Sequence, residues 1–322
     1  MRKTAQWDWP AATVYQEFVV SYLEQQQASE EVRRRVESYW PADVRGLRGP
    51  ELLDRVLASG AAVDARVNEV LVRLADPLAL PPAPRDLPWL ATEVPGWLQD
   101  ALRLACGRAF AQRKMYDEAL ESMAGIQVDQ VCDPGSLLFY RALSEHHLLQ
   151  PEACLEDVDL LLQRESELPV RYARLARLIR ADLEGYEPES LDEVARLMRD
   201  VHRRLDLGRA GQLVREEEQK IVEKLDKLIE QIEQQMQQQQ QQQSQSQGAD
   251  QQSQSRPMEE SQIAGGSGPG DVDKKDTGQR SGWGNLPPAQ RQEALQRLTE
   301  QLPSHYRDVI EGYFRELAKQ DR

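Results

Sequence analysis

The sequence predicts an all-α fold, and three observations lead to this prediction. Apolar residues recur every three to four positions through the first two hundred residues, which is the period of amphipathic helices. Short turns rich in proline and glycine separate these stretches. No stretch shows the sustained alternation of β-branched residues that is typical of strands. With 322 residues, the chain is long enough for about two ordinary domains.

Residues 1–75 are expected to form an N-terminal helical segment. Its first apolar stripe falls at Val14, Tyr15, Phe18, Val19, Tyr22 and Leu23. The pattern continues as far as Pro41. Gly49-Pro50 then opens another helix, since proline is well placed in a first helical turn, and a second stripe runs from Leu53 to Leu74.

Residues 76–96 form a connector rich in proline. Each proline lacks a backbone N–H and disfavours helix in the residue before it, so the connector should be stiff and not helical. Trp89 and Trp97 lie within and beside it. We expect these two rings to anchor the connector on the next helices rather than to form an aromatic ligand platform.

Residues 97–208 are predicted to form three consecutive helix pairs. The pairs are 98–113 with 117–124, 136–149 with 152–164, and 170–184 with 190–205. The last helix begins at Ser190 with Glu193 three residues later, the spacing of a capping box. Gly208 follows it as a stop signal.

The first of these pairs resembles a tetratricopeptide repeat. Gly107, Phe110, Ala119 and Met123 occupy four places of that pattern, and small residues at the first and third would let the two helices approach closely. Ala153 lies 34 residues after Ala119, which is the period of the repeat. The second pair departs from the pattern at its glycine and at one aromatic place, and the third does not keep the period. A set of tetratricopeptide-like hairpins is therefore expected, with an unrelated helical bundle as the alternative.

Residues 209–236 predict one long helix. An apolar seam with spacings of 7, 4, 3 and 4 is typical of coiled coils and falls at Val214, Ile221, Leu225, Leu228 and Ile232. Charged pairs such as Glu223 and Lys227 support the helix at i, i+4. Two outcomes stay open. The helix packs back on the hairpins, or residues 214–236 pair with a second copy in a homo-oligomer.

Residues 237–282 are expected to be a disordered linker of Gln, Ser and Gly. Apolar side chains nearly vanish there, so no burial offsets the entropy lost by ordering the backbone. The linker would act as a flexible tether.

Residues 283–320 are expected to form a C-terminal helical docking segment of two amphipathic helices. About thirty-five residues cannot bury such stripes alone. We expect the segment to dock on a partner protein, and the alternative is that it clasps the protein's own body. The candidate partner-binding residues are Trp283, Leu295, Leu298, Tyr306, Ile310, Tyr313, Phe314 and Leu317.

Several segments together resemble an uncharacterised helical family of planctomycete bacteria. The likeness is carried by Ser190-Leu191-Asp192-Glu193, by Trp283-Gly284-Asn285-Leu286-Pro287-Pro288 and by the run from His305 to Ala318. The resemblance implies no assigned activity, although similar proteins often carry an export signal. The start of this sequence shows none, so a cytoplasmic location is expected, with a periplasmic or envelope location as the alternative if a signal precedes it.

Composition excludes several classes of function. The net charge of −14 argues against broad binding to nucleic acid or anionic lipid, both of which need a positive surface. No run approaches the roughly 20 apolar residues of a membrane span. The three cysteines are too far apart in sequence for a zinc module, and no cofactor or metal site is expected.

We expect no enzymatic activity. The one thiol arrangement to weigh is Cys154 with His147, a minor alternative in which the cysteine is a nucleophile and the histidine its base. The expected function is a non-enzymatic scaffold for protein–protein interaction. A helical body and tethered C-terminal helices would bind partner proteins, with the alternative that the helical face alone does so.

Overall fold

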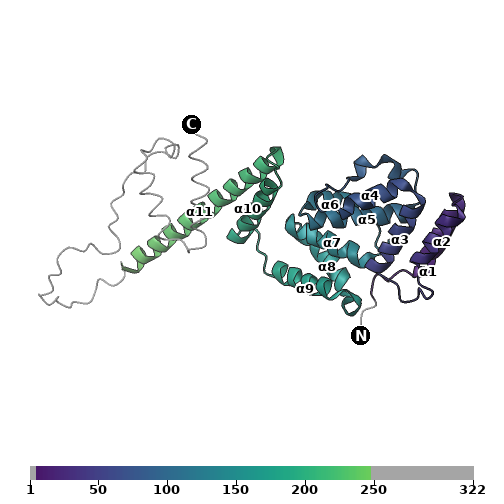
Figure 1. Cartoon of the computed structure of the whole chain (residues 1–322). Helices are drawn as coiled ribbons and strands as arrows, with labels where there is room; N and C mark the ends of the chain where they lie inside the picture. The colour runs from purple at the N-terminus through teal and green to yellow at the C-terminus, as the bar shows by residue number, and fades with distance from the viewer. Residues whose placement is uncertain (1–4, 248–322) are drawn as a thin grey trace, which may run out of the picture. The chain divides into compact units, whose positions relative to one another are not determined.

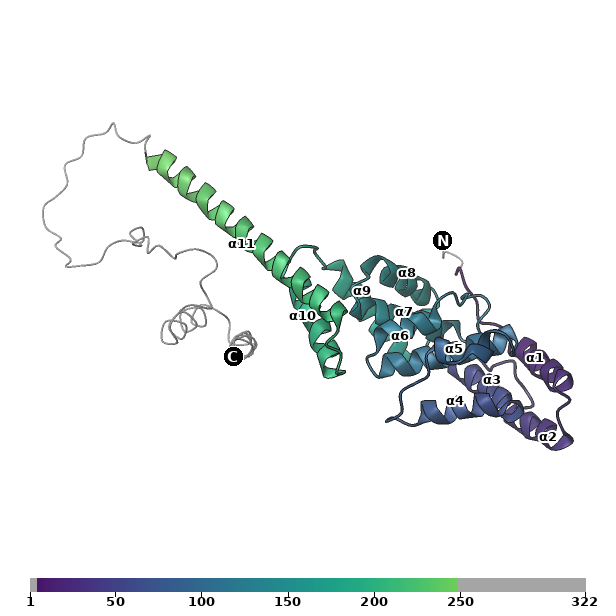
Figure 2. The same ribbon diagram turned by 90° about the horizontal axis from the view of Figure 1, so that it is seen from above.

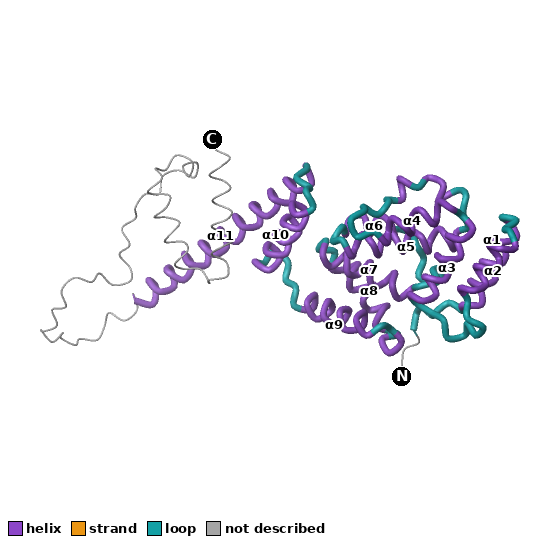
Figure 3. Tube along the Cα trace, viewed as in Figure 1, coloured by secondary structure: helices purple, strands orange, loops and turns teal. Residues whose placement is uncertain are grey.

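The computed structural model of the chain describes residues 5–247, and this range holds eleven α-helices and three short 3-10 helices but no strand (Figures 1 and 3). The prediction of an all-α fold is confirmed. Predictions that concern residues 248–322, including the docking segment 283–320, lie outside the described residues.

Four helices make up the N-terminal part: α1 (Ala12–Gln25), α2 (Glu30–Tyr39), α3 (Pro50–Val63) and α4 (Ala65–Ala75). Each of the two apolar stripes predicted for residues 1–75 is divided between two helices. Gln27 has a positive φ of 50°, which separates α1 from α2. The side chain of Asp64 accepts a hydrogen bond from the N–H of Arg66 and caps α4.

The connector contains two 3-10 helices, Pro84–Asp86 and Pro88–Ala91. Trp97 stacks on Phe18 of α1, with 6.2 Å between the ring centroids. The guanidinium of Arg66 lies 4.6 Å from the ring of Trp89. Trp89 therefore holds the connector against α4, whereas Trp97 belongs to α5 and packs on α1. These two contacts are with helices that precede the connector and not with the next helices, as the sequence had suggested.

The next helices are α5 (Gly96–Gln112), α6 (Tyr116–Met123), α7 (Pro134–His147), α8 (Pro151–Leu162) and α9 (Val170–Glu184). Helices α5 and α6 pack as one hairpin, α7 and α8 as a second, and α9 packs on α7 and α8. A Cβ added at Gly107 would lie only 2.5 Å from Cγ of Met123, so this glycine permits the close approach that the sequence predicted. These helices and the N-terminal ones share one apolar core.

Helix α10 (Leu191–Asp206) corrects the third predicted pair, because it packs chiefly on α11 (Gln212–Gln247) and meets α9 through the ion pair of Arg196 with Asp182 (Figure 2). Val194 and Val201 of α10 form a small separate core with Val214 and Ile221 of α11. The sequence-predicted seam of the long helix therefore faces α10, at least as far as Leu228.

Helix α11 also corrects the start of the predicted linker, since it continues to Gln247 and so past residue 237. Glutamine is a good helix former, and a helix that is already nucleated extends at little cost through such a run. The amphipathic pattern predicted only the part of the helix that needs burial.

An extended N-terminal segment packs on the second hairpin, which the sequence did not predict. The indole N–H of Trp7 donates a 2.7 Å hydrogen bond to the carbonyl of Leu160, and Arg164 Nε donates a 2.7 Å bond to the carbonyl of Trp7. The ring of Trp9 lies so close to Gly135 that a Cβ added there would be 2.7 Å from it. Segments more than 120 residues apart are joined in this way.

Candidate functional site

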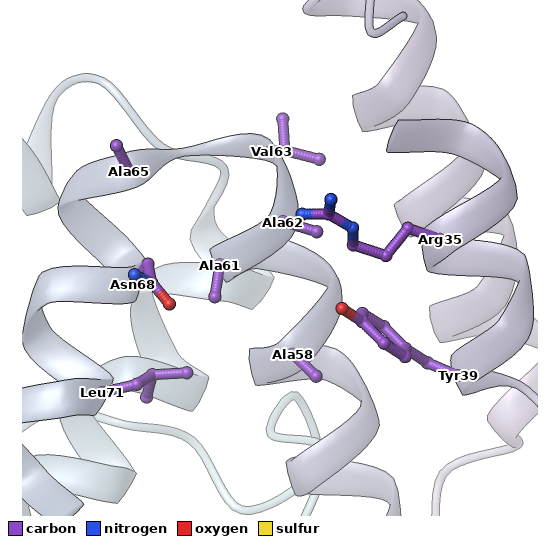
Figure 4. A pocket seen from close by; sticks show the side chains of 9 residues that line it. All are labelled: Arg35, Tyr39, Ala58, Ala61, Ala62, Val63, Ala65, Asn68 and Leu71. Carbon is purple, nitrogen blue, oxygen red and sulfur yellow. The ribbon is translucent and has the colours of Figure 1, made fainter. Parts of the chain in front are cut away.

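An open groove of about 530 Å³ lies between α2, α3 and α4. Figure 4 shows Arg35 and Tyr39 reaching in from α2, with Ala58, Ala61 and Ala62 of α3 between them and α4. Its remaining lining residues are Val63, Ala65, Asn68 and Leu71. We call this the α2–α4 groove.

Small side chains create the groove. Ala58, Ala61 and Ala62 line it from α3, where larger residues would fill the space between α2 and α4. The opposite face of the same helix is tightly packed, because a Cβ added at Gly60 would lie 2.6 Å from the side chain of Leu98. Helix α3 is thus closely packed against α5 on one side and leaves a shallow surface of small side chains on the other.

A second hollow of about 260 Å³ lies between α3, α4 and α5. Ala58 and Leu71 line both hollows, so the two adjoin across the junction of α3 and α4. Asp54 and Arg108 stand at the second hollow, with 3.9 Å between their charged atoms. An occupant longer than one helical turn could contact both.

The α2–α4 groove is weakly basic. Arg35 is the one charged residue among those that line it. Its ion pair with Glu31, at 3.5 Å, is largely solvent-exposed, and such pairs contribute little free energy. Arg35 can therefore change partner when a carboxylate enters the groove.

The sequence-predicted binding residues, from Trp283 to Leu317, lie outside the described residues, so the structure does not bring them to any site. The groove, in contrast, was missed by sequence reasoning. Its signal is the absence of bulk along Ala58, Ala61 and Ala62, which in a sequence reads simply as good helix-forming residues.

The geometry around Cys154 does not activate its thiol. The side chain is fully buried, and Sγ donates a 3.2 Å hydrogen bond to the carbonyl of Ala142. Burial, followed by the nearby charges of Glu145 and Asp157, raises the pKa of the thiol to about 12. A thiol with this pKa is protonated at neutral pH and is a poor nucleophile.

His147 is occupied in packing. Its ring stacks on Tyr116, with 4.3 Å between the centroids, and burial lowers its pKa to about 4. A base this weak would take up a proton poorly at neutral pH. The thiol-enzyme alternative gains no support from this arrangement.

Two buried carboxylates, Glu145 of α7 and Asp157 of α8, lie near enough for the charge of one to act on the other. Arg141 Nε lies 2.9 Å from Asp157, whereas Oε2 of Glu145 has no hydrogen-bond partner. Burial, and then the charge of Asp157, raises the pKa of Glu145 to about 7. Burial also raises the pKa of Asp157 to about 6, against the opposing effect of Arg141.

The described residues therefore form an all-helical protein with an open groove lined mostly by small side chains. Comparison with protein-family models, with curated proteins and with solved structures gave no match for the chain. In residues 5–247, no helix combines the length and apolar character that crossing a membrane requires. The same residues bring together no cluster of three or more side chains able to hold a metal ion.

Proposed function

We propose that this chain is a non-enzymatic scaffold for protein–protein interaction, and that its helical body binds an amphipathic helix of a partner protein in the α2–α4 groove. The observation that carries the proposal is the groove of about 530 Å³ with an alanine floor, open between two helices. A helix laid in a groove of this kind is a recurring mode of protein recognition.

The lining predicts the chemistry of the partner helix. Because Ala58, Ala61 and Ala62 are small, the partner must supply the bulk as large apolar side chains spaced by three or four residues. Tyr39 gives one wall an aromatic face with a polar tip, which suits an interface. Arg35 favours a partner that carries a carboxylate beside its apolar stripe.

The C-terminal docking segment 283–320, predicted from the sequence, would add a second binding element. Its expected anchors are Tyr306, Ile310, Tyr313 and Phe314. A body with one binding surface and a tail with another would hold two proteins together, which is the action of a scaffold.

Site-specific photo-crosslinking in cells that produce the full chain tests the groove. Tyr39→p-benzoylphenylalanine places the crosslinker at the groove wall with little change of shape, and Val72→p-benzoylphenylalanine places it on an exposed position of α4 outside the groove. We expect a discrete crosslinked protein at position 39 only. Sequencing of the crosslinked peptide should find an amphipathic helical stretch with an acidic residue beside the apolar ones.

A charge reversal supplies the matched control. Arg35→Glu should abolish the crosslink, whereas Arg34→Glu, on the same helix but outside the groove lining, should leave it unchanged. Equal loss in both variants, or a crosslinked peptide without amphipathic character, would refute the proposed mode of binding.

A further inference from the structure

Helices α10 and α11 expose apolar side chains at a regular spacing of seven residues. On α10 these are Leu191, Met198 and Leu205, and on α11 they are Val222, Ile229 and Met236. Ile232 joins the second set, three residues after Ile229. All seven are between 37% and 66% exposed, although isolated surface helices normally turn polar side chains to solvent. We call these seven residues the α10–α11 stripe.

Both halves of the stripe lie on the same side of the helix pair. At 100° per residue, the stripe on α10 is rotated by about 50° from Val194 and Val201, which face α11. On α11, Val222, Ile229 and Met236 are rotated by about 70° in the same sense from Val214 and Ile221, whereas Ile232 lies nearly in line with those two residues. Because the two helices run in opposite directions, rotations in the same sense bring both halves to one face.

Helix α11 also outlasts its partner within the chain. The ion pair between Lys224 and Glu193, at 2.8 Å, places the start of α10 beside the middle of α11. Met236 therefore continues the stripe where no part of α10 lies alongside, and Ile232 is uncovered there as well. These two exposed side chains gain no stabilisation from packing within the described part of the chain.

We infer that the α10–α11 stripe is a self-association surface, at which a second copy of this chain packs its own α10–α11 stripe to form a four-helix arrangement. A seven-residue period on two helices fits a surface with the same period, and an identical stripe supplies it. A two-fold axis along the helices brings α10 of one copy against α11 of the other, so the contact closes on itself.

The exposed area is sufficient for such a contact. From their exposed fractions, the seven side chains present roughly 600 Å² per copy, close to the about 800 Å² that each partner buries in a standard interface. Polar side chains at the edge of the stripe would supply the remainder.

Charge also permits self-association here. Residues 191–236 contain eleven acidic and nine basic residues, a net charge of −2, whereas the whole chain has a net charge of −14. Two copies that meet through this segment therefore avoid most of the like-charge repulsion that other faces of the chain would bring.

Sedimentation equilibrium of the full chain, over concentrations from about 1 to 100 µM, tests the inference. We expect a reversible dimer. Met198→Glu combined with Ile229→Glu should weaken dimerisation by roughly a hundredfold or more, because each contact would bury unpaired charge. The control combines Val72→Glu with Leu178→Glu, which are similarly exposed but lie outside the stripe, and it should leave the dimer unchanged.

A second variant distinguishes loss of the dimer contact from unfolding of the α10–α11 pair. Met236 lies beyond the end of α10, so Met236→Glu removes no contact with α10 and should weaken the dimer while preserving the far-UV circular dichroism of the monomer. A chain that stays monomeric at every concentration would overturn the inference, and another protein or another segment would then cover the stripe. A dimer of equal strength in the stripe variants and the control would overturn it as well.

Discussion

Replacement of Glu145 by glutamine should make the protein more stable at alkaline pH. Glu145 is only 6% exposed, and its Oε2 has no hydrogen-bond partner among the described residues. Burial in the α7–α8 hairpin, together with the charge of Asp157, raises its pKa from 4.5 to about 7. A carboxyl whose pKa is higher in the folded than in the unfolded chain binds protons more tightly when folded, so the free energy of unfolding falls as pH rises between these values.

The magnitude follows from the shift. A rise of about 2.5 pKa units corresponds to roughly 3 kcal/mol, of which about 2 to 3 kcal/mol appears between pH 5 and pH 8. Glutamine has nearly the same shape and does not ionise. The loss of stability from pH 5 to pH 8 should therefore be smaller in Glu145→Gln than in the unaltered chain by about 2 to 3 kcal/mol.

Urea denaturation at the two pH values measures this difference, and comparison across pH cancels any constant cost of the new amide. Glu37→Gln, at an exposed position of α2, is the control and should change the pH dependence by less than about 0.5 kcal/mol. The reasoning is refuted if Glu145→Gln loses as much stability between pH 5 and pH 8 as the unaltered chain.

Three further outcomes are expected. Gly135→Ala should lower the free energy of unfolding, measured by urea denaturation, by about 1 to 3 kcal/mol, because the new Cβ would lie 2.7 Å from the Trp9 ring. The control Gly46→Ala places its Cβ in open space and should lower the free energy of unfolding much less. Iodoacetamide should modify Cys154 slowly in the folded chain and rapidly in urea, because the thiol is buried and has a pKa of about 12. Peptide mass spectrometry measures the two rates, and fast modification of the folded chain would support the thiol-enzyme alternative. Ser190→Ala should cost about 1 kcal/mol by removing the cap of α10, and an unchanged melting temperature would contradict this.

Local signals in the sequence predicted the helices well, because each helix satisfies its own backbone and shows its buried face as a periodic stripe. Ser190 illustrates the reach of such signals: its Oγ accepts a hydrogen bond from the N–H of Glu193, as the capping pattern predicted. The return bond differs, since the Glu193 carboxylate accepts from the N–H of Glu189 and from Lys224. The second of these contacts joins α10 to α11, and no local pattern encodes it.

Which helices pair was predicted less well. Chain order suggested that α10 would fold back on α9, yet the apolar side chains Val194 and Val201 pack on α11. An amphipathic face indicates that a helix packs on another element, but it does not indicate which element. The N-terminal tryptophans were missed for the same reason, because the docking of Trp7 on Leu160 depends on contacts across 153 residues.

Helix α10 is attached to α6 and to the turn before it by polar contacts. These contacts do not bury the exposed apolar side chains of the α10–α11 pair. Arg204 reaches Asp117 of α6 at 3.0 Å, and Arg203 donates a 2.6 Å hydrogen bond to the carbonyl of Lys114. The Arg204 side chain is buried while Asp117 stays partly exposed, and the hydration that such a pair loses offsets most of its attraction. The apolar core of the α10–α11 pair itself is small. Apart from Leu213, the exposed large apolar side chains of the pair all belong to the α10–α11 stripe, so burial of that stripe would stabilise these helices, and a second copy could bury it.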